Sequence, residues 1–143
     1  GLMHIDLDFF KQVNDTHGHA AGDHVLREVA RVLREETRAS DLAARVGGDE
    51  FVLIFPGLTE AARLIRIARR IIARLTRPID YDGQTCRISA SIGVTLSAYY
   101  NPPEAERMLS DADAALYASK RAGRAQVQLF ARPDTDTEAR DIA

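Results

Sequence analysis

Two acidic motifs in this chain combine carboxylates in a way that suits metal chemistry. Asp6 and Asp8 end a short apolar run, and Asp49 and Glu50 lie between two further apolar runs. A carboxylate that ends an apolar strand is costly to bury unless something pairs with it. Magnesium commonly binds one or two carboxylates together with phosphate oxygens. If the two motifs converge, they predict a magnesium and phosphate site; taken alone, they fit solvated carboxylates equally well.

A basic cluster near the end of the chain offers the opposite charge. Lys120 and Arg124 are four residues apart and share one face of a predicted helix, with Arg121 beside them. Lys11 directly follows the first acidic motif. These cations predict a phosphate clamp, but cations at the end of a helix also complement its dipole, and the residue types alone leave both readings open.

Glycine and histidine residues near the acidic motifs carry weaker signals. Gly47 and Gly48 allow a ligand to approach the backbone closely, yet two glycines between apolar runs are also typical of a plain hairpin turn. His17 and His19 lie in a Thr-His-Gly-His segment that is more typical of a polar loop than of a metal site.

Composition limits the classes of protein that remain. The chain has 143 residues, of which 45% are hydrophobic and 28% charged, and its net charge of -2 argues against a whole-chain grip on nucleic acid or anionic membranes. Cys86 is the only cysteine, which excludes an intrachain disulfide and a cysteine-based zinc site. No apolar run approaches the roughly 20 residues of a membrane-spanning helix, and no signal peptide is visible. We therefore expect a soluble, cytoplasmic, single-domain protein.

Apolar periodicity predicts alternating strands and helices. Strands are expected over residues 2–7, 42–46, 51–55, 88–96 and 127–130, the fourth with one buried face. Helices are expected over residues 23–38, 59–75 and 102–123, with a single helical turn over 9–13 and an accessory hairpin over 78–85. The order β-α-β-β-α-β-α-β predicts an α/β (α+β) fold, in which helices flank a central mixed sheet and Asp49 and Glu50 lie at a β-hairpin turn.

Several segments together resemble the GGDEF family of diguanylate cyclases. RVGGDEF at residues 45–51 is similar to the family signature, and DLDFFKQVNDTHGH at residues 6–19 is similar to a second family motif. Matching segments follow in the same order at Gly22-Asp23 with Leu26, at ASIGV (90–94), at ADAALYASK (112–120) and at Gly123-Arg124. The resemblance covers nearly everything from residue 2 to residue 130. It implies a palm-like nucleotidyl cyclase fold that condenses two GTP into cyclic dimeric GMP and releases two pyrophosphates.

The resemblance also implies roles for the acidic motifs. Asp6, the Leu7 carbonyl and Asp49 match metal ligands, for two Mg²⁺ (or Mn²⁺) ions per active site. Asp49 is needed for turnover, and Glu50 assists metal or proton handling. Each protomer binds one GTP, so a homodimer is expected to be required for activity.

Further matches concern the substrate and its product. Asn14 and Asp23 match the residues that read the guanine edge, where a carboxylate accepts from guanine N–H groups. The expected contacts to the rest of GTP are Phe9, Phe10, Lys11, Gly47, Gly48, Lys120 and Arg124. Arg38 and Asp41 match the product-inhibition site, which arginine suits because it stacks on guanine and grips phosphate; Arg69 or Arg70 is a looser match for a second arginine.

The ends of the chain bear on its context. Residues 1–130 match the GGDEF domain without the family's usual N-terminal segment, and residues 131–143 form a polar linker similar to the one that leads to an EAL phosphodiesterase domain. The expected partners are GTP, cyclic dimeric GMP, a second copy, and linked EAL and sensor domains, with no nucleic acid and no direct membrane contact. Two alternatives to a cyclase are a GTP-binding regulatory module without turnover and a cyclic dimeric GMP receptor that acts through Arg38 and Asp41.

Overall fold

The two faces of the first strand, β1 (Leu2–Asp8), explain how the molecule is layered. Met3, Ile5 and Leu7 are buried in the main core, which also contains residues of the helices α1 (Phe10–His17), α2 (His19–Glu36) and α3 (Ala61–Leu75). The alternate residues of β1 face the last helix, α4 (Ala105–Arg121), which contacts them through ion pairs. This structure is a computed structural model that describes residues 1–130; the linker expected over residues 131–143 lies outside the described residues.

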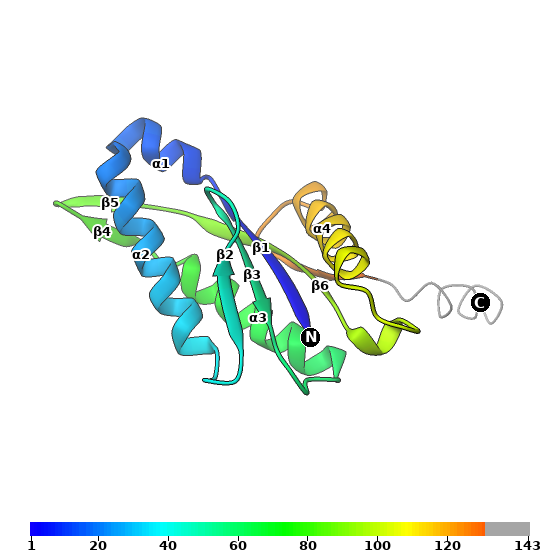
Figure 1. Cartoon of the computed structure of the whole chain (residues 1–143). Coiled ribbons are helices and arrows are strands. Elements are labelled where there is room, and N and C mark those ends of the chain that lie inside the picture. The colour runs from blue at the N-terminus through cyan, green and yellow to red at the C-terminus, as the bar shows by residue number, and fades with distance from the viewer. Residues whose placement is uncertain (131–143) are drawn as a thin grey trace.

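β1 is the middle strand of a five-stranded sheet with the order β2-β3-β1-β6-β7 (Figure 1). All neighbouring strands pair antiparallel except β6 and β7, which are parallel, so the predicted mixed sheet flanked by helices is confirmed. The other strands of this sheet are β2 (Leu42–Arg45), β3 (Glu50–Ile54), β6 (Ser89–Thr95) and β7 (Val127–Leu129). The predicted accessory hairpin is formed by β4 (Ile79–Tyr81) and β5 (Gln84–Cys86), and a short 3-10 turn follows β6 at Ser97–Tyr99.

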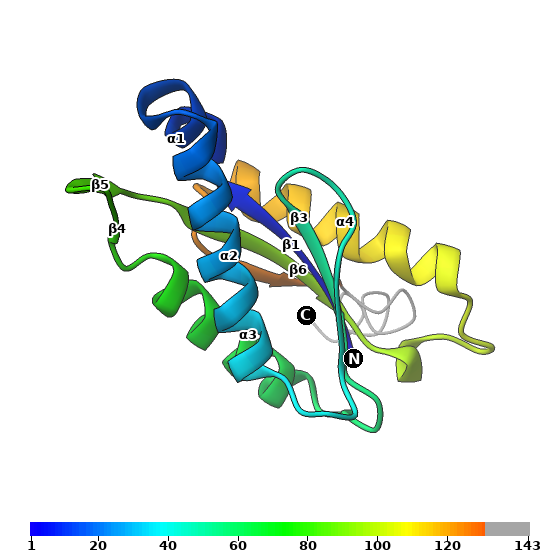
Figure 2. The same cartoon turned by 60° about the vertical axis from the view of Figure 1, so that its left-hand side comes forward.

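Helices cover both faces of the sheet (Figure 2), with α2 and α3 on one side and α4 on the other. As a result all seven residues of β6 are buried, and the expectation of one buried face on this strand is wrong. The alternating serines that suggested a solvent face instead hydrogen-bond inside the protein. Gly93 allows α4 to pack closely against β6, because a Cβ there would overlap the backbone of Ala112 and Leu116 in α4.

Several helix boundaries differ from the sequence-based expectation. α3 begins at Ala61 rather than at residue 59, and α4 spans Ala105–Arg121 rather than residues 102–123. The single turn predicted over 9–13 extends to His17, and the second helix begins at His19 rather than at residue 23. Gly18, with a φ of 90°, is the only residue that separates the two helices. The polar Thr-His-Gly-His segment therefore marks a sharp corner between helices and not a long loop. This corner brings the start of α2 back toward α1.

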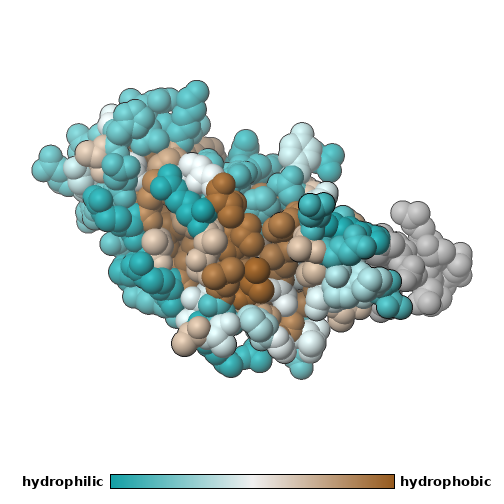
Figure 3. All heavy atoms as spheres, in the orientation of Figure 1, coloured by the Kyte–Doolittle hydropathy of each residue, from teal (hydrophilic) through white to brown (hydrophobic). Residues whose placement is uncertain are grey.

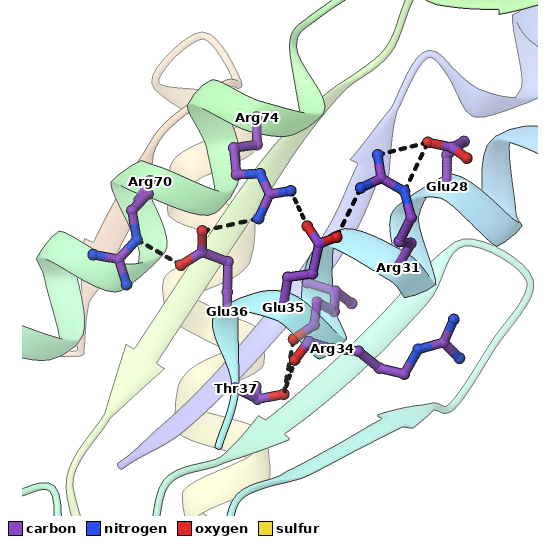
Figure 4. A network of polar contacts seen from close by, with 9 residues as sticks. Glu28, Arg31, Arg34, Glu35, Glu36, Thr37, Arg70 and Arg74 are labelled. Atoms are coloured by element: carbon purple, nitrogen blue, oxygen red, sulfur yellow. Dashed lines mark hydrogen bonds and ion pairs between the residues drawn. The ribbon is translucent and has the colours of Figure 1, made fainter. Parts of the chain in front are cut away.

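An ion-pair network holds α2 against α3 (Figure 4). Arg74 of α3 donates to both Glu35 and Glu36 at the end of α2, and Arg70 donates to Glu36. Arg31 joins the network by donating to Glu35 over 2.9 Å. Hydrogen bonds from Arg74 and Arg31 hold the pKa of Glu35 below its ordinary value. The two helices are thus joined by charge at their outer rim and by apolar packing beneath it.

The face of the molecule seen in Figure 3 is mostly polar, with an apolar region over β2, β3 and the start of β1. Leu42 and Val46, at the two ends of β2, are about half exposed. Within residues 1–130, no helix combines the length and the apolar character needed to cross a membrane.

Candidate active site

The two acidic motifs meet at one edge of the sheet. Asp6 of β1 is the register partner of Glu50 in β3, and the backbone N–H of Leu7 donates to the carbonyl of Asp49 over 3.0 Å. This pairing follows from the hairpin between β2 and β3, whose second strand runs antiparallel to β1. The structure therefore brings together the carboxylates of Asp6, Asp49 and Glu50. This convergence is the condition under which the sequence predicted a magnesium and phosphate site.

The surroundings of Asp6 at this edge shift the pKa of its carboxyl. Burial raises the pKa of its carboxyl, and the nearby negative charges of Asp49 and Glu50 raise it further. The ammonium of Lys120 opposes this shift by donating to Asp6 Oδ1 over 2.8 Å. Lys120 thus pairs with Asp6, whereas no ion pair of Asp49 or Glu50 is found among the described residues, so this edge has negative charge that a bound cation would neutralise.

This donor set fits a hard divalent ion. Oxygen ligands are what Mg²⁺ prefers, and it typically needs only one or two carboxylates from the protein because substrate phosphates and water complete its shell. Within residues 1–130, no group of three or more His, Cys, Asp or Glu side chains that could hold a metal ion is found.

The turn between β2 and β3 is braced by a residue that the sequence reasoning missed. The guanidinium of Arg45 donates to the carbonyls of Gly47 and Gly48, at 2.9–3.2 Å. A Cβ at Gly47 would lie 2.9 Å from Glu50 Oε2, so a side chain there would displace the carboxylate of Glu50. Arg45 directly precedes the turn in sequence. Its short spacing from Gly47 and Gly48 was the signal from which these hydrogen bonds could have been predicted.

Asp8 has a different environment from Asp6, although both lie on the same face of β1. Only 1% of Asp8 is exposed, and its carboxylate accepts hydrogen bonds from the hydroxyls of Ser89 and Ser91 at 2.7 and 2.8 Å. It is therefore saturated by neighbours within the protein. The sequence grouped Asp8 with the expected metal-binding acids, whereas the structure surrounds it with hydrogen-bond donors from β6.

Phe9 and Phe10 form the corner at which β1 becomes α1. Phe9 adopts a left-handed conformation with a φ of 67° and is half exposed, whereas the Phe10 ring packs in the core. The corner aims the first N–H groups of α1 at the end of β1, and such groups lack partners within their helix. Lys11 is exposed on the first turn, and the structure records no partner for it among the described residues.

Asn14 and Asp23 come from different helices, and the corner at Gly18 brings them near each other. The Asn14 side chain lies directly over Gly22, where a Cβ would overlap its amide oxygen. Asp23, the next residue, lines a cleft of about 420 Å³ between α2 and β2 whose walls include Leu26, Ala43 and Phe51. Asp23 thus lines a cleft whose walls carry both apolar and arginine side chains, and the planar amide of Asn14 lies beside the preceding residue, Gly22.

Arg38 and Asp41 lie in a separate place, beyond the C-terminus of α2. The backbone N–H of Arg38 donates to Asp41 Oδ2 over 2.8 Å, which folds the loop on itself. Both residues line a cavity of about 450 Å³ that also includes Arg63, Arg66 and Arg70 of α3. Of the two looser candidates for a second arginine, Arg70 lines this cavity, and Arg69 is not among its lining residues.

Comparison with known proteins shows which family and which solved structure this chain is similar to. The family described as "Diguanylate cyclase, GGDEF domain" matches residues 1–126. Diguanylate cyclase A of Treponema denticola is 43% identical over 90% of this chain, and the probable diguanylate cyclase DgcE of Escherichia coli is 47% identical over 90% of it. The crystal structure of the GGDEF domain of DgcB from Caulobacter crescentus, in complex with c-di-GMP, superposes with a TM-score of 0.82 at 36% identity, and the match covers 90% of this chain and 76% of that one. The matches to the two curated relatives span only 34% and 12% of their lengths, respectively.

Proposed function

This chain belongs to the GGDEF family of diguanylate cyclase domains, and from this we propose that it condenses two molecules of GTP into cyclic dimeric GMP. The observation that carries the proposal is the meeting of Asp6, Asp49 and Glu50 at one sheet edge beside the ammonium of Lys120. Such a site combines acceptors for a divalent cation with a donor for phosphate. The structural match to a GGDEF domain solved with c-di-GMP supports the same reaction.

The proposed reaction is a double phosphoryl transfer. The 3′-oxygen of each GTP attacks the α-phosphorus of the other, so that two phosphodiester bonds form and two bonds between α-phosphorus and bridging oxygen break. Each displaced pyrophosphate carries away the electron pair of the broken bond, and each 3′-hydroxyl gives up its proton. Catalysis of this kind depends chiefly on positioning and on electrostatic stabilisation.

Each part of the nucleotide has residues suited to it. Asn14 and Asp23 bind the guanine edge, and Asp23 lines the cleft between α2 and β2, where Leu26 and Phe51 offer apolar contact. Lys120 and Arg124 bind the phosphates, together with Lys11 and the amides that follow Phe9. Gly47 and Gly48 let the nucleotide approach the backbone of the signature turn.

Asp6, Asp49 and the carbonyl of Leu7 would hold two Mg²⁺ or Mn²⁺ ions, with Glu50 beside them. Bound there, the ions supply neutralisation of the phosphate charge and favour ionisation of the attacking hydroxyl. Lys120 pairs with Asp6 and so neutralises part of the carboxylate charge at this edge. When a nucleotide occupies the site, the ammonium of Lys120 is well placed to share its hydrogen bonds with phosphate oxygens.

The replacement Asp49→Asn tests the proposal, because it removes a negative charge while keeping the size of the side chain. We expect the rate of cyclic dimeric GMP formation, followed by chromatography with GTP and Mg²⁺, to fall at least about 100-fold, which is the upper range for loss of a residue that supports a metal. Asp113→Asn is a matched control, since Asp113 borders the same edge on α4 but is exposed and pairs only with His4.

Two outcomes would overturn the proposal. One is a folded unaltered protein, shown by light scattering to be dimeric, that binds GTP but leaves it unchanged; this result favours a GTP-binding regulatory module. The other is an Asp49→Asn variant that retains the full rate.

A second role, as a receptor for cyclic dimeric GMP that limits synthesis, is supported by the arginine-lined cavity. Arg38 and Asp41 offer a guanidinium for phosphate or for stacking on a base and a carboxylate for the guanine edge. Arg63, Arg66 and Arg70 supply further positive charge. We therefore propose this cavity as the inhibitory site.

Arg38→Ala should raise the inhibition constant of cyclic dimeric GMP by about tenfold or more, because a charge-assisted hydrogen bond of roughly 1.5–3 kcal/mol is lost. The measurement is an inhibition titration of the initial rate. Arg69→Ala is the matched control, since Arg69 is an exposed arginine of α3 that does not line the cavity. An unchanged inhibition constant for Arg38→Ala would contradict the assignment.

The proposal also includes the bounds of the domain, its cellular location and its covalent partners. We assign residues 1–130 to the cyclase domain and infer that it works in the cytoplasm, where GTP is supplied and the single buried thiol of Cys86 stays reduced. The resemblance of residues 131–143 to a linker supports EAL and sensor domains as covalent partners.

A further inference from the structure

Asp8 is a buried carboxylate that has no role so far in the proposed reaction. Its Oδ1 accepts from the hydroxyl of Ser91, and its Oδ2 accepts from the hydroxyl of Ser89 and from the backbone N–H of Ala125 over 3.2 Å. Its side chain is fully covered. A carboxylate so deeply buried is costly unless its acceptors are filled, and here each oxygen has at least one donor.

The donor from Ala125 belongs to an unusual turn between α4 and β7. Gly123, Arg124 and Ala125 all have positive φ, at 119°, 66° and 51°. Glycine adopts this conformation readily, but Arg124 and Ala125 do so only against steric resistance, so the surrounding structure must hold them. The turn is held by hydrogen bonds from Gly123 N–H to the carbonyl of Lys120, from Arg124 N–H to the carbonyl of Ser119, and from the Gln126 amide to the carbonyl of Arg124. The bond from Ala125 N–H to Asp8 is the one that ties the turn to β1.

The Arg124 side chain extends from this strained turn toward the acidic edge. Its Nε lies 4.0 Å from Asp8 Oδ1, and its guanidinium carbon lies 5.8 Å from the centre of the Phe9 ring. Half of the side chain is exposed, so the guanidinium has donors available for a ligand. The ammonium of Lys120 lies 3.7 Å from the same Asp8 oxygen. The Asp8 carboxylate therefore lies close to the cationic groups of both Lys120 and Arg124.

We propose that Asp8 is a positioning residue that fixes the turn carrying Arg124 and thereby aims its guanidinium at the phosphates of the bound nucleotide. Asp8 itself touches no substrate, because its carboxylate is covered and its acceptors are filled. The proposal rests on the proposed function, in which Arg124 contacts phosphate. It separates two carboxylates of one strand: Asp6 serves the ligand directly, and Asp8 acts through Arg124.

A double-mutant cycle between Asp8 and Arg124 tests the proposal. The ligand is GTP with a methylene group between its α- and β-phosphorus atoms, which cannot react, and its dissociation constant is measured by calorimetry with Mg²⁺. We expect Arg124→Ala and Asp8→Ala each to raise this constant about tenfold. Asp8→Ala in the Arg124→Ala background should add less than about twofold, since Asp8 acts through a side chain that is already absent.

Two further variants separate positioning from general loss of structure. Asp8→Asn keeps an oxygen that accepts from Ala125 N–H, so it should restore most of the affinity lost in Asp8→Ala. Asp111→Ala is the matched control, because Asp111 is a carboxylate of α4 that accepts from the Tyr100 hydroxyl and does not contact the turn. GMP, which lacks the outer phosphates, should bind all these variants with an unchanged constant.

The outcomes distinguish failure of this inference from failure of the proposed function. If Arg124→Ala leaves the affinity for the analogue unchanged, the phosphate role of Arg124 is wrong and the inference falls with it. If Arg124→Ala weakens binding while Asp8→Ala adds its full effect in that background, or weakens GMP equally, only the inference is overturned. If Asp8→Ala does not fold, the same cycle with Asp8→Asn decides, with an expected loss of about two- to threefold that vanishes in the Arg124→Ala background.

Discussion

Asn14 and Gly22 are complementary residues on two helices that meet at a corner. The amide of Asn14 occupies the space that a side chain at position 22 would need. Because Gly22 precedes Asp23, this close contact also sets the spacing between the amide and the carboxylate that we assign to the guanine edge. A glycine inside a helix usually lowers stability, and here its use is explained by the neighbouring side chain.

Gly22→Ala should therefore affect nucleotide binding more than it affects the fold. The added methyl group displaces the Asn14 amide, and loss of one hydrogen bond to guanine corresponds to an increase of about tenfold in the KM for GTP. The measurement is the initial rate as a function of GTP concentration. Ala20→Ser, on the exposed side of the same helix, serves as the control. A KM that stays the same while Asn14→Ala raises it would show that the amide is not displaced.

At the scale of elements, the contact between α4 and the sheet decides where Lys120 and Arg124 lie. The helix approaches so closely at Gly93 that its backbone at Ala112 and Leu116 takes the place of a side chain. Ser119 strengthens the contact by donating to the carbonyl of Ile92 over 2.7 Å. The helix that carries the cations is thus fixed to β6 by its backbone and not only by apolar packing.

Gly93→Ala should lower the free energy of unfolding by about 1–3 kcal/mol, the usual cost of excess volume in a packed interior, because the clash is with backbone that cannot rotate away. Urea denaturation followed by circular dichroism measures this change. Gly48→Ala is the control for the added methyl group, since nothing lies within 4 Å of a Cβ at that position. Equal stability of the two variants would mean that α4 is free to shift.

The positions of the helices and strands could be predicted from the sequence more accurately than which of their faces are buried against one another. Helical spacing correctly indicated the three long helices, and the two glycines correctly indicated the hairpin at Asp49. The role of His4, Asp6 and Asp8 as one polar face of β1 was missed because a helix and not water covers that face. Similarly, the serines of β6 look like solvent-facing residues until the buried carboxylate of Asp8 is known.

At the scale of the whole molecule, the proposed reaction needs two copies of this chain. Each copy offers one cleft beside one acidic edge, whereas the product contains two nucleotides joined by two bonds. The sequence left open whether Asp6 and Asp49 converge, because the order of strands along the chain does not show that β1 lies beside β3. The arginine cavity was predictable only in part, because Arg38 and Asp41 are close in sequence, whereas Arg63 and Arg66 reach the cavity from a separate helix.

The rate per mole of protein should consequently rise with protein concentration and then level off, since in the proposed reaction the active species is a dimer in equilibrium with inactive monomers. Initial rates at saturating GTP, measured across a dilution series together with light scattering, check this expectation. A rate per mole that is constant while scattering reports only monomers would contradict it.

The central place of β1 in the sheet has a consequence for the order of folding. Leu2 pairs with Ile54 on one side and with Thr95 on the other, and Asp6 finds Lys120 only when the last helix is in place. Because closing such distant contacts is entropically costly, chains that depend on them fold slowly compared with chains built from local contacts. During synthesis β1 leaves the ribosome before both of its neighbours in the sheet, β3 and β6, and can pair only after they follow. The acidic edge therefore assembles late, when nearly all of the described chain has been made.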